Sequence, residues 1–170
     1  MEIRNFIRDV PDFPKAGIIF KDITPLLRSP EAFKSTIDSL VEPFRDERVS
    51  VVAGIESRGF IFGAAVARAL GAGFIPIRKP GKLPWTKRRN EYVLEYGTDA
   101  LEIHDDAVTI DDRVLIIDDV LATGGTAAAA TQLIRGFGPT LVGLATVIEL
   151  TFLDPRTKLA GLEIHTLIQY

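Results

Sequence analysis

The alternation of apolar and polar segments along the chain predicts strands that alternate with helices. Short apolar runs rich in β-branched residues are typical of buried strands. They occupy residues 49–55, 74–77, 114–117, 141–150 and 163–168. Helices are expected at about 30–44, at 59–70 and from a glycine-rich turn near 124 to about 136. Strands and helices in this order predict an α/β fold, with a mostly parallel, twisted sheet and helices on both faces.

Three segments depart from this alternation. Residues 10–17 are too rich in proline and glycine for a helix, which predicts an irregular start. Residues 80–90 contain two prolines and several cations and are expected to form a basic loop. Residues 91–104 are expected to form two short extended pieces, broken at Gly97. No internal repeat or long linker divides the chain, so we predict a single domain over residues 1–170.

Composition narrows the class of protein. The chain has 170 residues, a net charge of −3 and no cysteine. The acidic balance gives no support to a nucleic-acid or membrane partner, and the absence of cysteine excludes thiol nucleophiles and disulfides. The apolar runs are too short to span a bilayer. We therefore expect a soluble, cytoplasmic enzyme or regulator.

Residues 114–126, VLIIDDVLATGGT, carry the strongest chemical signal. A buried strand leads to two carboxylates at its carboxyl end, and a turn with two glycines then enters a helix. Backbone N–H groups of such a turn, together with the helix N-terminus, bind anions. The turn lacks the lysine of a nucleoside-triphosphate loop and the glycine spacing of a dinucleotide fingerprint. It suits a phosphate monoester, and the adjacent carboxylates suit the hydroxyls of an attached sugar.

Two other acidic pairs serve as an internal comparison. Asp105–Asp106 and Asp111–Asp112 neither follow an apolar strand nor precede a glycine-rich helix start. We interpret both as surface turns, so the context of the pair at 118–119 is what sets it apart.

Taken whole, residues 114–126 resemble the phosphoribosyl pyrophosphate (PRPP) motif of the type I phosphoribosyltransferases. The resemblance implies that fold, and it implies that the ribose 2- and 3-hydroxyls lie beside Asp118 and Asp119. It further implies a magnesium ion bound mainly through the diphosphate of the substrate, with no direct protein ligand. The residues implied to hold the 5-phosphate are Ala122, Thr123, Gly124, Gly125 and Thr126.

Four further blocks are similar to the adenine phosphoribosyltransferases, in the same order along the chain. They are residues 13–27, 54–60, 78–84 and 92–97. The resemblance implies AMP formation from adenine and PRPP, with release of diphosphate. It assigns backbone contacts with adenine to Ile19 and Lys21, stacking to Phe20 and the N3 side of the base to Arg58. Adenine has no oxygen, so backbone N–H and C=O groups of an irregular segment are suited to its edge; taken alone, Phe20 would be interpreted as a core residue.

The diphosphate site is also implied by the resemblance. It would be formed by Glu56, Ser57, Arg58, Arg78, Lys79, Lys82 and Tyr96. We predict a cis peptide bond between Glu56 and Ser57, as is common in the family at this turn. Cations after the strand at 74–77 would stabilise the departing anion. Lys87, Arg88 and Arg89 lie in the least family-like stretch and are interpreted as surface charge.

A closing site is expected, because an oxocarbenium-like sugar would react with water. Residues 80–97 are the expected flexible lid and residues 1–35 a small N-terminal hood that binds the base. The resemblance makes Glu95 the catalytic group that shares a proton with adenine N7. It also implies a homodimer, in which a basic residue reaches the partner's site. The histidines, His104 and His165, are interpreted as structural.

Three alternatives remain open on the sequence. The chain could transfer the sugar to another base, such as hypoxanthine, guanine or orotate. It could be a regulator that binds PRPP without catalysis, although it has no DNA-binding module or basic face. A plain dinucleotide-binding module is opposed by the missing glycine fingerprint.

Overall fold

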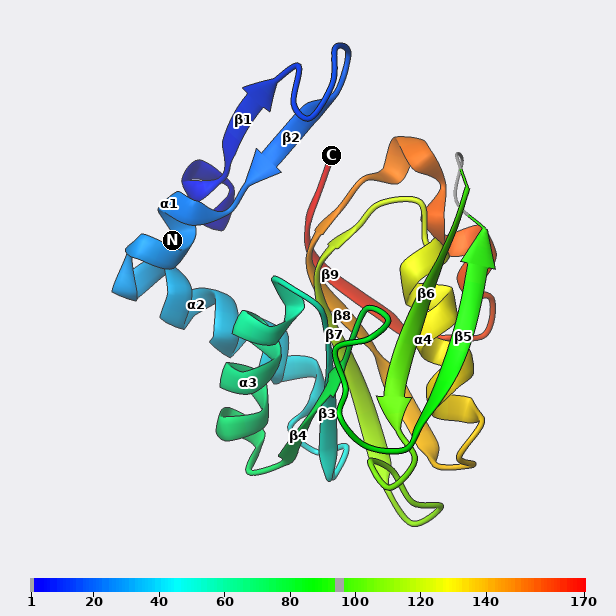
Figure 1. Cartoon of the computed structure of the whole chain (residues 1–170). Coiled ribbons are helices and arrows are strands. Elements are labelled where there is room, and N and C mark those ends of the chain that lie inside the picture. The colour runs from blue at the N-terminus through cyan, green and yellow to red at the C-terminus, as the bar shows by residue number, and fades with distance from the viewer. Residues whose placement is uncertain (1, 94–96) are drawn as a thin grey trace.

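A five-stranded parallel sheet forms the centre of the molecule (Figure 1). The structure is a computed structural model and describes residues 2–93 and 97–170. Its strand order is β4-β3-β7-β8-β9. The strands are β3 (Val51–Ile55), β4 (Gly73–Ile77), β7 (Arg113–Leu121), β8 (Thr140–Glu149) and β9 (Ile164–Gln169). The predicted parallel sheet is confirmed, with each expected strand within a few residues of its place.

Helices cover both faces of the sheet, as predicted. Helices α2 (Pro30–Val41) and α3 (Gly59–Leu70) pack on one face and α4 (Gly125–Arg135) on the other (Figure 1). Strand β7 shows why: Leu115 and Ile117 belong to the apolar cluster with α2 and α3, whereas Val114 and Ile116 belong to the cluster with α4. Successive side chains of a strand point to opposite faces of the sheet. A continuous apolar run therefore places apolar side chains against the helices on both faces.

The helix ends follow the capping residues in the sequence. The Ser29 hydroxyl accepts a hydrogen bond from the Ala32 N–H at 3.2 Å, and Pro30 occupies the first turn of α2. Helix α3 ends at Gly71, whose left-handed conformation (φ 70°) suits a residue without a Cβ. A 3₁₀ turn, Glu42–Phe44, extends α2 to the predicted end. Within the described residues, no helix is long and apolar enough to cross a membrane.

The predicted irregular stretch at 10–17 forms a loop from residue 12 onward, but strands that the sequence did not predict flank it. After a 3₁₀ turn (Ile3–Phe6), strands β1 (Arg8–Pro11) and β2 (Ile19–Asp22) form an antiparallel hairpin, followed by the short helix α1 (Thr24–Arg28). The prolines and glycine that argued against regular structure fall in its loop or at a strand end. There the Asp12 carboxylate accepts a hydrogen bond from the Gly17 N–H at 2.7 Å. A two-stranded ribbon still leaves one outer edge of each strand unpaired.

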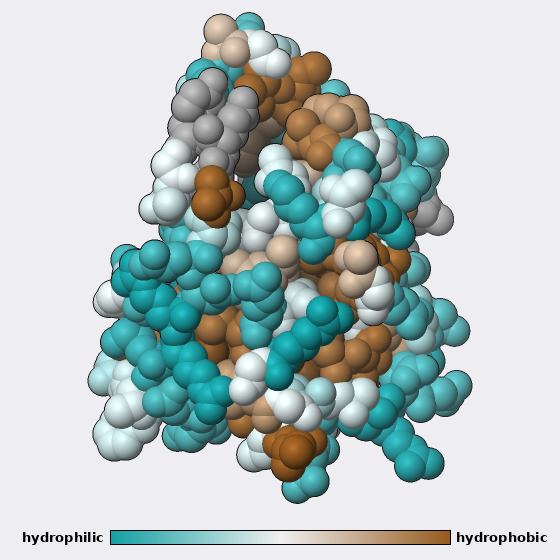
Figure 2. All heavy atoms as spheres, turned by 90° about the vertical axis from the view of Figure 1, so that its right-hand side faces the viewer, coloured by the Kyte–Doolittle hydropathy of each residue, from teal (hydrophilic) through white to brown (hydrophobic). Residues whose placement is uncertain are grey.

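A second ribbon corrects the expected basic loop at 80–90. Strand β5 (Lys87–Val93) begins inside that stretch and pairs with β6 (Thr98–His104). Its Arg88 reaches the residues just after α4: the guanidinium lies 3.8 Å from the Phe137 ring centre and donates to the Gly136 carbonyl at 2.7 Å. The face that carries β5 is mainly hydrophilic, with apolar side chains between (Figure 2). Arg88 is therefore a surface charge with a packing role.

The remaining elements are two 3₁₀ turns between β8 and β9. The turns Thr151–Leu153 and Pro155–Leu159 bring the chain from the end of β8 back to the start of β9. Asp154 separates them in a left-handed conformation, with φ 48°. This connection lies beside the glycine-rich bend that follows β7, as the site geometry shows.

Candidate functional site

The bend between β7 and α4 encloses a small polar pocket. Gly124 has φ 80°, and α4 begins at the next residue. The pocket has a cavity volume of about 80 Å³ and opens at the carboxyl end of the sheet, where parallel α/β folds bind ligands. It is lined by Asp118, Val120, Leu121, Ala122, Thr123, Gly124, Thr126, Ala127 and Thr146. Four of the five predicted phosphate-binding residues, all except Gly125, and one of the two carboxylates thus line one cavity.

The bend has no room for a side chain at Gly124. A Cβ built there would lie 2.5 Å from the carbonyl oxygen of Pro155, which is fixed backbone. Positive φ and this close approach both require glycine. The 3₁₀ connection after β8 therefore supports the bend from behind.

The acidic pair lies inside β7 and not at its tip, because the strand continues to Leu121. The Asp118 carboxylate accepts a hydrogen bond from the Asp119 N–H at 2.9 Å, and Asp119 pairs with Arg58 at 2.8 Å. Burial, and then the neighbouring Asp119 carboxylate, raise the pKa of Asp118 well above its ordinary value. Burial also raises the pKa of Asp119, although Arg58 opposes the shift. Groups that bring hydrogen-bond donors or positive charge to this pair would favour its ionised form.

Arg58 joins the acidic pair to the N-terminal hairpin. Its guanidinium lies 4.8 Å from the centre of the Phe20 ring, and the ring of Phe13 meets Phe20 edge-on at 5.2 Å. Phe20 is half-buried and belongs to neither apolar cluster of the described residues. The interpretation of Phe20 as a core residue is therefore wrong. The structure places it, through Arg58, beside the carboxylates of β7.

The turn between β3 and α3 packs directly against the same carboxylates. The peptide bond between Glu56 and Ser57 is cis, which confirms the prediction. A Cβ on Gly59 would lie 2.9 Å from both the Asp118 carboxylate and the Ile117 carbonyl, so glycine permits the contact. The turn that was predicted to hold diphosphate therefore lies next to Asp118, which was predicted to lie beside the ribose hydroxyls.

The cations after β4 pair with acidic residues that the sequence did not single out as partners. Glu56 accepts from the Arg78 guanidinium at 3.1 Å and from the Lys79 N–H at 2.9 Å. Burial alone would raise the pKa of Glu56, but these two hydrogen bonds lower it below its ordinary value. The Arg78 guanidinium also donates to the Lys82 carbonyl at 3.3 Å. Hydrogen bonds thus join Glu56, in the turn after β3, to Arg78 and Lys79, which follow β4.

The Tyr92 hydroxyl on the β5–β6 ribbon connects Lys79 with the glycine-rich bend. The Lys79 ammonium pairs with Asp99 and donates to the Tyr92 hydroxyl at 3.0 Å. Tyr92 also accepts from Thr126 at 3.2 Å and donates to Asp99 at 3.1 Å. Burial opposes the charge of Lys79, yet the bonds to Asp99 and Tyr92 raise its pKa above the ordinary value. Lys79 is therefore a fixed cation next to the helix start.

Some predicted residues stand apart from this cluster. The Ile19 side chain is exposed on the hairpin, and the Lys21 side chain turns to Asp9 at 2.7 Å, which leaves backbone contacts as their possible role. Glu95 and Tyr96 lie outside the described residues. The acidic pairs at 105–106 and 111–112 lie at turns; Asp105, Asp106 and Asp111 are exposed, and Asp112 caps its own turn by accepting from the Thr109 N–H at 2.8 Å.

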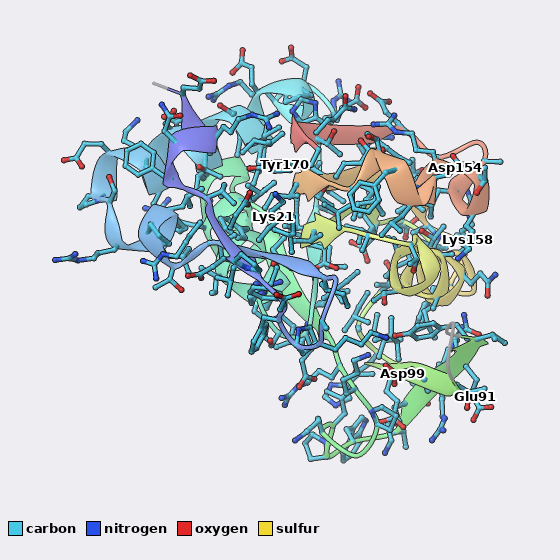
Figure 3. The ribbon with its side chains drawn as sticks, turned by 90° about the horizontal axis from the view of Figure 1, so that it is seen from above. Lys21, Glu91, Asp99, Asp154, Lys158 and Tyr170 are labelled. Atoms are coloured by element: carbon cyan, nitrogen blue, oxygen red, sulfur yellow. The ribbon has the colours of Figure 1, made fainter. Side chains whose placement is uncertain are left out.

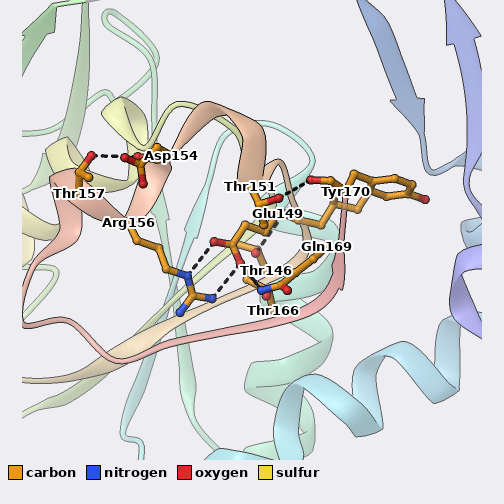
Figure 4. Close-up of polar contacts among 10 residues, drawn as sticks. Thr146, Glu149, Thr151, Asp154, Arg156, Thr157, Thr166, Gln169 and Tyr170 are labelled. Carbon is orange, nitrogen blue, oxygen red and sulfur yellow. Dashed lines mark hydrogen bonds and ion pairs between the residues drawn. The ribbon is translucent and has the colours of Figure 1, made fainter.

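The sequence analysis missed a buried carboxylate at the end of β8. Glu149 is 1% exposed and accepts from the Arg156 guanidinium at 2.7 and 2.8 Å, from Thr166 at 3.0 Å and from Gln169 at 3.0 Å (Figure 4). The Arg156 hydrogen bond is the main cause that lowers the pKa of Glu149 to about 2. A glutamate in an otherwise apolar strand was the available signal. By binding Arg156, Glu149 fixes the neighbouring Pro155, whose carbonyl oxygen lies against Gly124.

Within the described residues, no three His, Cys, Asp or Glu side chains come together as a metal site. Asp118 and Asp119 are the acidic groups beside the pocket, and both already accept hydrogen bonds or pair within the protein. Magnesium commonly uses one or two carboxylates together with substrate phosphates and water. The donor set fits an ion that arrives with a phosphorylated substrate, and it is too small for a cage made by this chain alone.

Comparisons with known proteins agree with this geometry. Residues 24–160 match the phosphoribosyl transferase domain family, so the chain is a phosphoribosyltransferase by class. It is 55% identical to the adenine phosphoribosyltransferase of Acaryochloris marina, with all of both chains covered. The crystal structure of the enzyme from Thermoanaerobacter pseudethanolicus superposes with a TM-score of 0.96 at 50% identity, covering 99% of this chain and 98% of that one.

A third relative was solved with ligands. The adenine phosphoribosyltransferase of Saccharomyces cerevisiae, complexed with an imino-altritol bisphosphate and adenine, has a TM-score of 0.93 and 40% identity, covering 98% of this chain and 97% of that one. On this sequence and structural similarity, the chain belongs to the adenine phosphoribosyltransferase family.

Proposed function

We propose that this protein transfers the 5-phosphoribosyl group of PRPP to adenine, forming AMP and diphosphate. The bond from ribose C1 to the diphosphate oxygen breaks, the bond from C1 to adenine N9 forms, and the base loses one proton. The observation that carries the proposal is the contact series from Phe20 through Arg58 to Asp119, next to the bend at 122–126. It puts a stacking surface, two carboxylates and an anion cradle in the order of base, ribose and phosphate.

In this proposal the backbone N–H groups and hydroxyls of the bend hold the 5-phosphate. The residues are Ala122, Thr123, Gly124, Gly125 and Thr126. Asp118 and Asp119 accept hydrogen bonds from the ribose 2- and 3-hydroxyls and stabilise the positive charge that develops at C1. Their raised pKa values are consistent with a site that ionises fully when such donors arrive.

Diphosphate would bind where the turns after β3 and β4 meet. The proposed residues are Glu56, Ser57, Arg58, Arg78, Lys79, Lys82 and Tyr96. Lys79 supports this because its contacts keep it charged beside Thr126. Magnesium, bound mainly through the diphosphate of PRPP and with no direct protein ligand, would neutralise part of the diphosphate charge. The carboxylate of Glu56 orients Arg78 and the Lys79 backbone.

Adenine would lie against Phe20, its edge read by the backbone of Ile19 and Lys21 on the hairpin, with Arg58 at its N3 side. Glu95 is the proposed catalytic residue, sharing a proton with N7 while N9 attacks C1. We further propose that residues 1–35 act as a hood, that residues 80–97 close as a lid, that the protein is a homodimer, and that it works in the cytoplasm.

Glu95→Gln tests the proposed proton transfer. The amide is similar in size but cannot share the proton, so turnover should fall by about 10² to 10⁴-fold, the usual worth of general acid–base catalysis. The KM for PRPP should change by less than about threefold, because the group acts on the base. Steady-state kinetics with each substrate varied in turn make the measurement. A turnover equal to wild type would remove Glu95 from the mechanism.

A panel of bases tests the proposed function itself. The protein is incubated with PRPP, magnesium and, separately, adenine, hypoxanthine, guanine or orotate, and nucleotide products are separated by chromatography. AMP should accumulate with adenine, while the oxopurines and orotate give little or no product. Formation of a different nucleotide would support the alternative base. PRPP binding with no product from any base would support a regulator instead.

A further inference from the structure

The side chain of Lys21 is buried, although it belongs to an exposed hairpin. It is only 11% exposed, whereas its partner Asp9 is 54% exposed. Its ammonium lies 2.7 Å from the Asp9 carboxylate and 3.8 Å from the ring centre of Tyr170. Viewed from above the molecule, Lys21 and Tyr170 point toward one another across the gap between β2 and the end of β9 (Figure 3). A charged side chain in this setting is held firmly, and with it the backbone of β2.

The main chain of Tyr170 is fixed to the sheet. Its N–H donates to the Glu149 carbonyl at 2.9 Å. Its carbonyl accepts from the Thr151 N–H at 2.9 Å and from the Thr151 hydroxyl at 2.7 Å (Figure 4). The ring therefore projects from a rigid edge of the sheet, at the carboxyl end of β8.

A second cation binds the same ring from the N-terminal segment. The Arg4 guanidinium lies 4.5 Å from the Tyr170 ring centre and donates to the Gln169 carbonyl at 2.7 Å. Cations are attracted to the faces of aromatic rings, more strongly where water is excluded. The Tyr170 ring thus contacts two cations of the N-terminal segment: Arg4, which precedes β1, and Lys21, which lies in β2.

The hairpin has few other attachments. In the described part of the chain, β1 and β2 pair only with each other, and the ribbon stands clear of the five-stranded sheet (Figure 1). The end of β9 approaches it from the sheet side (Figure 1). Besides the contact of Arg58 with Phe20, the contacts of Tyr170 with Arg4 and Lys21 therefore connect this segment to the main body of the protein.

We infer that Tyr170 is a positioning residue for adenine. It fixes the position of β2, so that the backbone groups of Ile19 and Lys21 can contact the base. This inference rests on the proposed function and assigns that function a residue outside the base pocket. Tyr170 would act through Lys21 and would not touch the substrate. Its loss should weaken adenine binding selectively, because the main-chain bonds that support the phosphate side survive a change of side chain.

Tyr170→Leu removes the ring and keeps apolar volume. The KM for adenine should rise about 10-fold, the size of effect expected from one or two desolvated cation–ring contacts. The KM for PRPP should stay within about twofold, because the bend at 122–126 is unchanged. Tyr170→Phe retains the ring and should restore the adenine KM. Phe152→Leu, at an exposed aromatic residue three positions after the end of β8, is the matched control and should behave as wild type.

A double-mutant cycle identifies the partner of the ring. Lys21→Met keeps the aliphatic stem and removes the charge, so it should also raise the adenine KM. Combined with Tyr170→Leu, it should add less than about twofold, because each change already breaks the same contact. Two fully additive effects, or an equal rise in both KM values for Tyr170→Leu, would overturn the inference.

Hydrogen exchange separates this inference from the proposed function. In the unliganded protein, Tyr170→Leu should speed amide exchange in residues 8–22 while leaving β7 unchanged, and Tyr170→Phe should leave both unchanged. If wild type makes no AMP, the proposed function fails, and exchange still decides whether Tyr170 holds the hairpin. If wild type makes AMP but exchange and adenine KM are unaltered in Tyr170→Leu, the positioning role is wrong and the function stands.

Discussion

Gly124→Ala should abolish efficient use of PRPP, lowering kcat/KM for that substrate by at least about 100-fold, since small displacements in a binding site carry losses of this size. The reason is steric. A methyl group at residue 124 would lie 2.5 Å from the Pro155 carbonyl oxygen, where neither backbone can yield without moving the bend. The amides that are proposed to hold the 5-phosphate would move with it.

Stability should fall together with activity. An L-residue at φ 80° costs about 1–2 kcal/mol, and the overpacking adds about 1–3 kcal/mol. Urea unfolding and PRPP-dependent kinetics on the same preparation make both measurements.

Gly161→Ala is the matched control for this substitution. Gly161 has φ 75°, but a Cβ there would meet nothing within 4 Å. The free energy of unfolding of Gly161→Ala should fall only by the conformational cost of about 1–2 kcal/mol, and the variant should keep the wild-type KM for PRPP. If kcat/KM for PRPP falls equally in both variants, backbone strain alone explains the effect and the contact with Pro155 has no special role. A Gly124→Ala variant with normal kinetics would show that the bend does not hold the phosphate.

Glu149→Gln should destabilise the protein by about 3 kcal/mol near pH 7, because each unit of pKa shift corresponds to about 1.4 kcal/mol. The hydrogen bond from Arg156 is the main cause that lowers the pKa of Glu149 from 4.5 to about 2. Glu149 is 1% exposed, whereas the side chain of Arg156 is 47% exposed, so solvent screens part of the interaction and about 3 kcal/mol is the upper end of the expected loss. Glutamine retains the shape but loses the charge that faces Arg156.

The effect of Glu149 should depend on pH in a defined interval. A carboxylate whose pKa is depressed in the folded state stabilises the fold above its unfolded pKa, and this stability is lost as pH falls through the folded value. The advantage of wild type over Glu149→Gln should thus be full above about pH 5 and should shrink between about 4.5 and 2. Denaturant midpoints at pH 7, 5, 4 and 3 follow the difference. A gap that is the same at pH 3 and pH 7 would contradict this account of Glu149.

An exposed pair provides the comparison. Lys34 and Asp38 form an i,i+4 ion pair on α2, with side chains 77% and 52% exposed. Pairs of this kind contribute about 0.3–0.5 kcal/mol on a helix surface. Asp38→Asn should therefore change stability by less than about 1 kcal/mol at any of these pH values.

The sequence predicted the sheet and the glycine-rich bend after β7 because those features are local. A buried parallel strand is a short apolar run, and the turn at Gly124 requires glycine in any context. Resemblance added the cis bond at Glu56, which no local pattern would have indicated. The hairpin at 8–22 was missed because its turn residues outweighed the short alternating strands on either side.

Contacts between distant segments could not be predicted. Glu149 meets Arg156, Thr166 and Gln169 only after β8 and β9 have paired. Tyr92 connects Lys79 with Thr126 across three elements, and nothing near Tyr92 in the sequence indicates either partner. Residue type alone would make Phe20 a core residue, because aromatic residues are usually buried. The resemblance assigned it to stacking instead, and the structure places it with Phe13 and Arg58, outside both apolar clusters.

A crystal structure with AMP bound tests the central claim most directly. The 5′-phosphate should lie in the bend at 122–126, the ribose hydroxyls within hydrogen-bond distance of Asp118 and Asp119, and the base against Phe20. Thr126 should then donate to the phosphate in place of Tyr92. A nucleotide bound anywhere else, with that bend empty, would contradict the account.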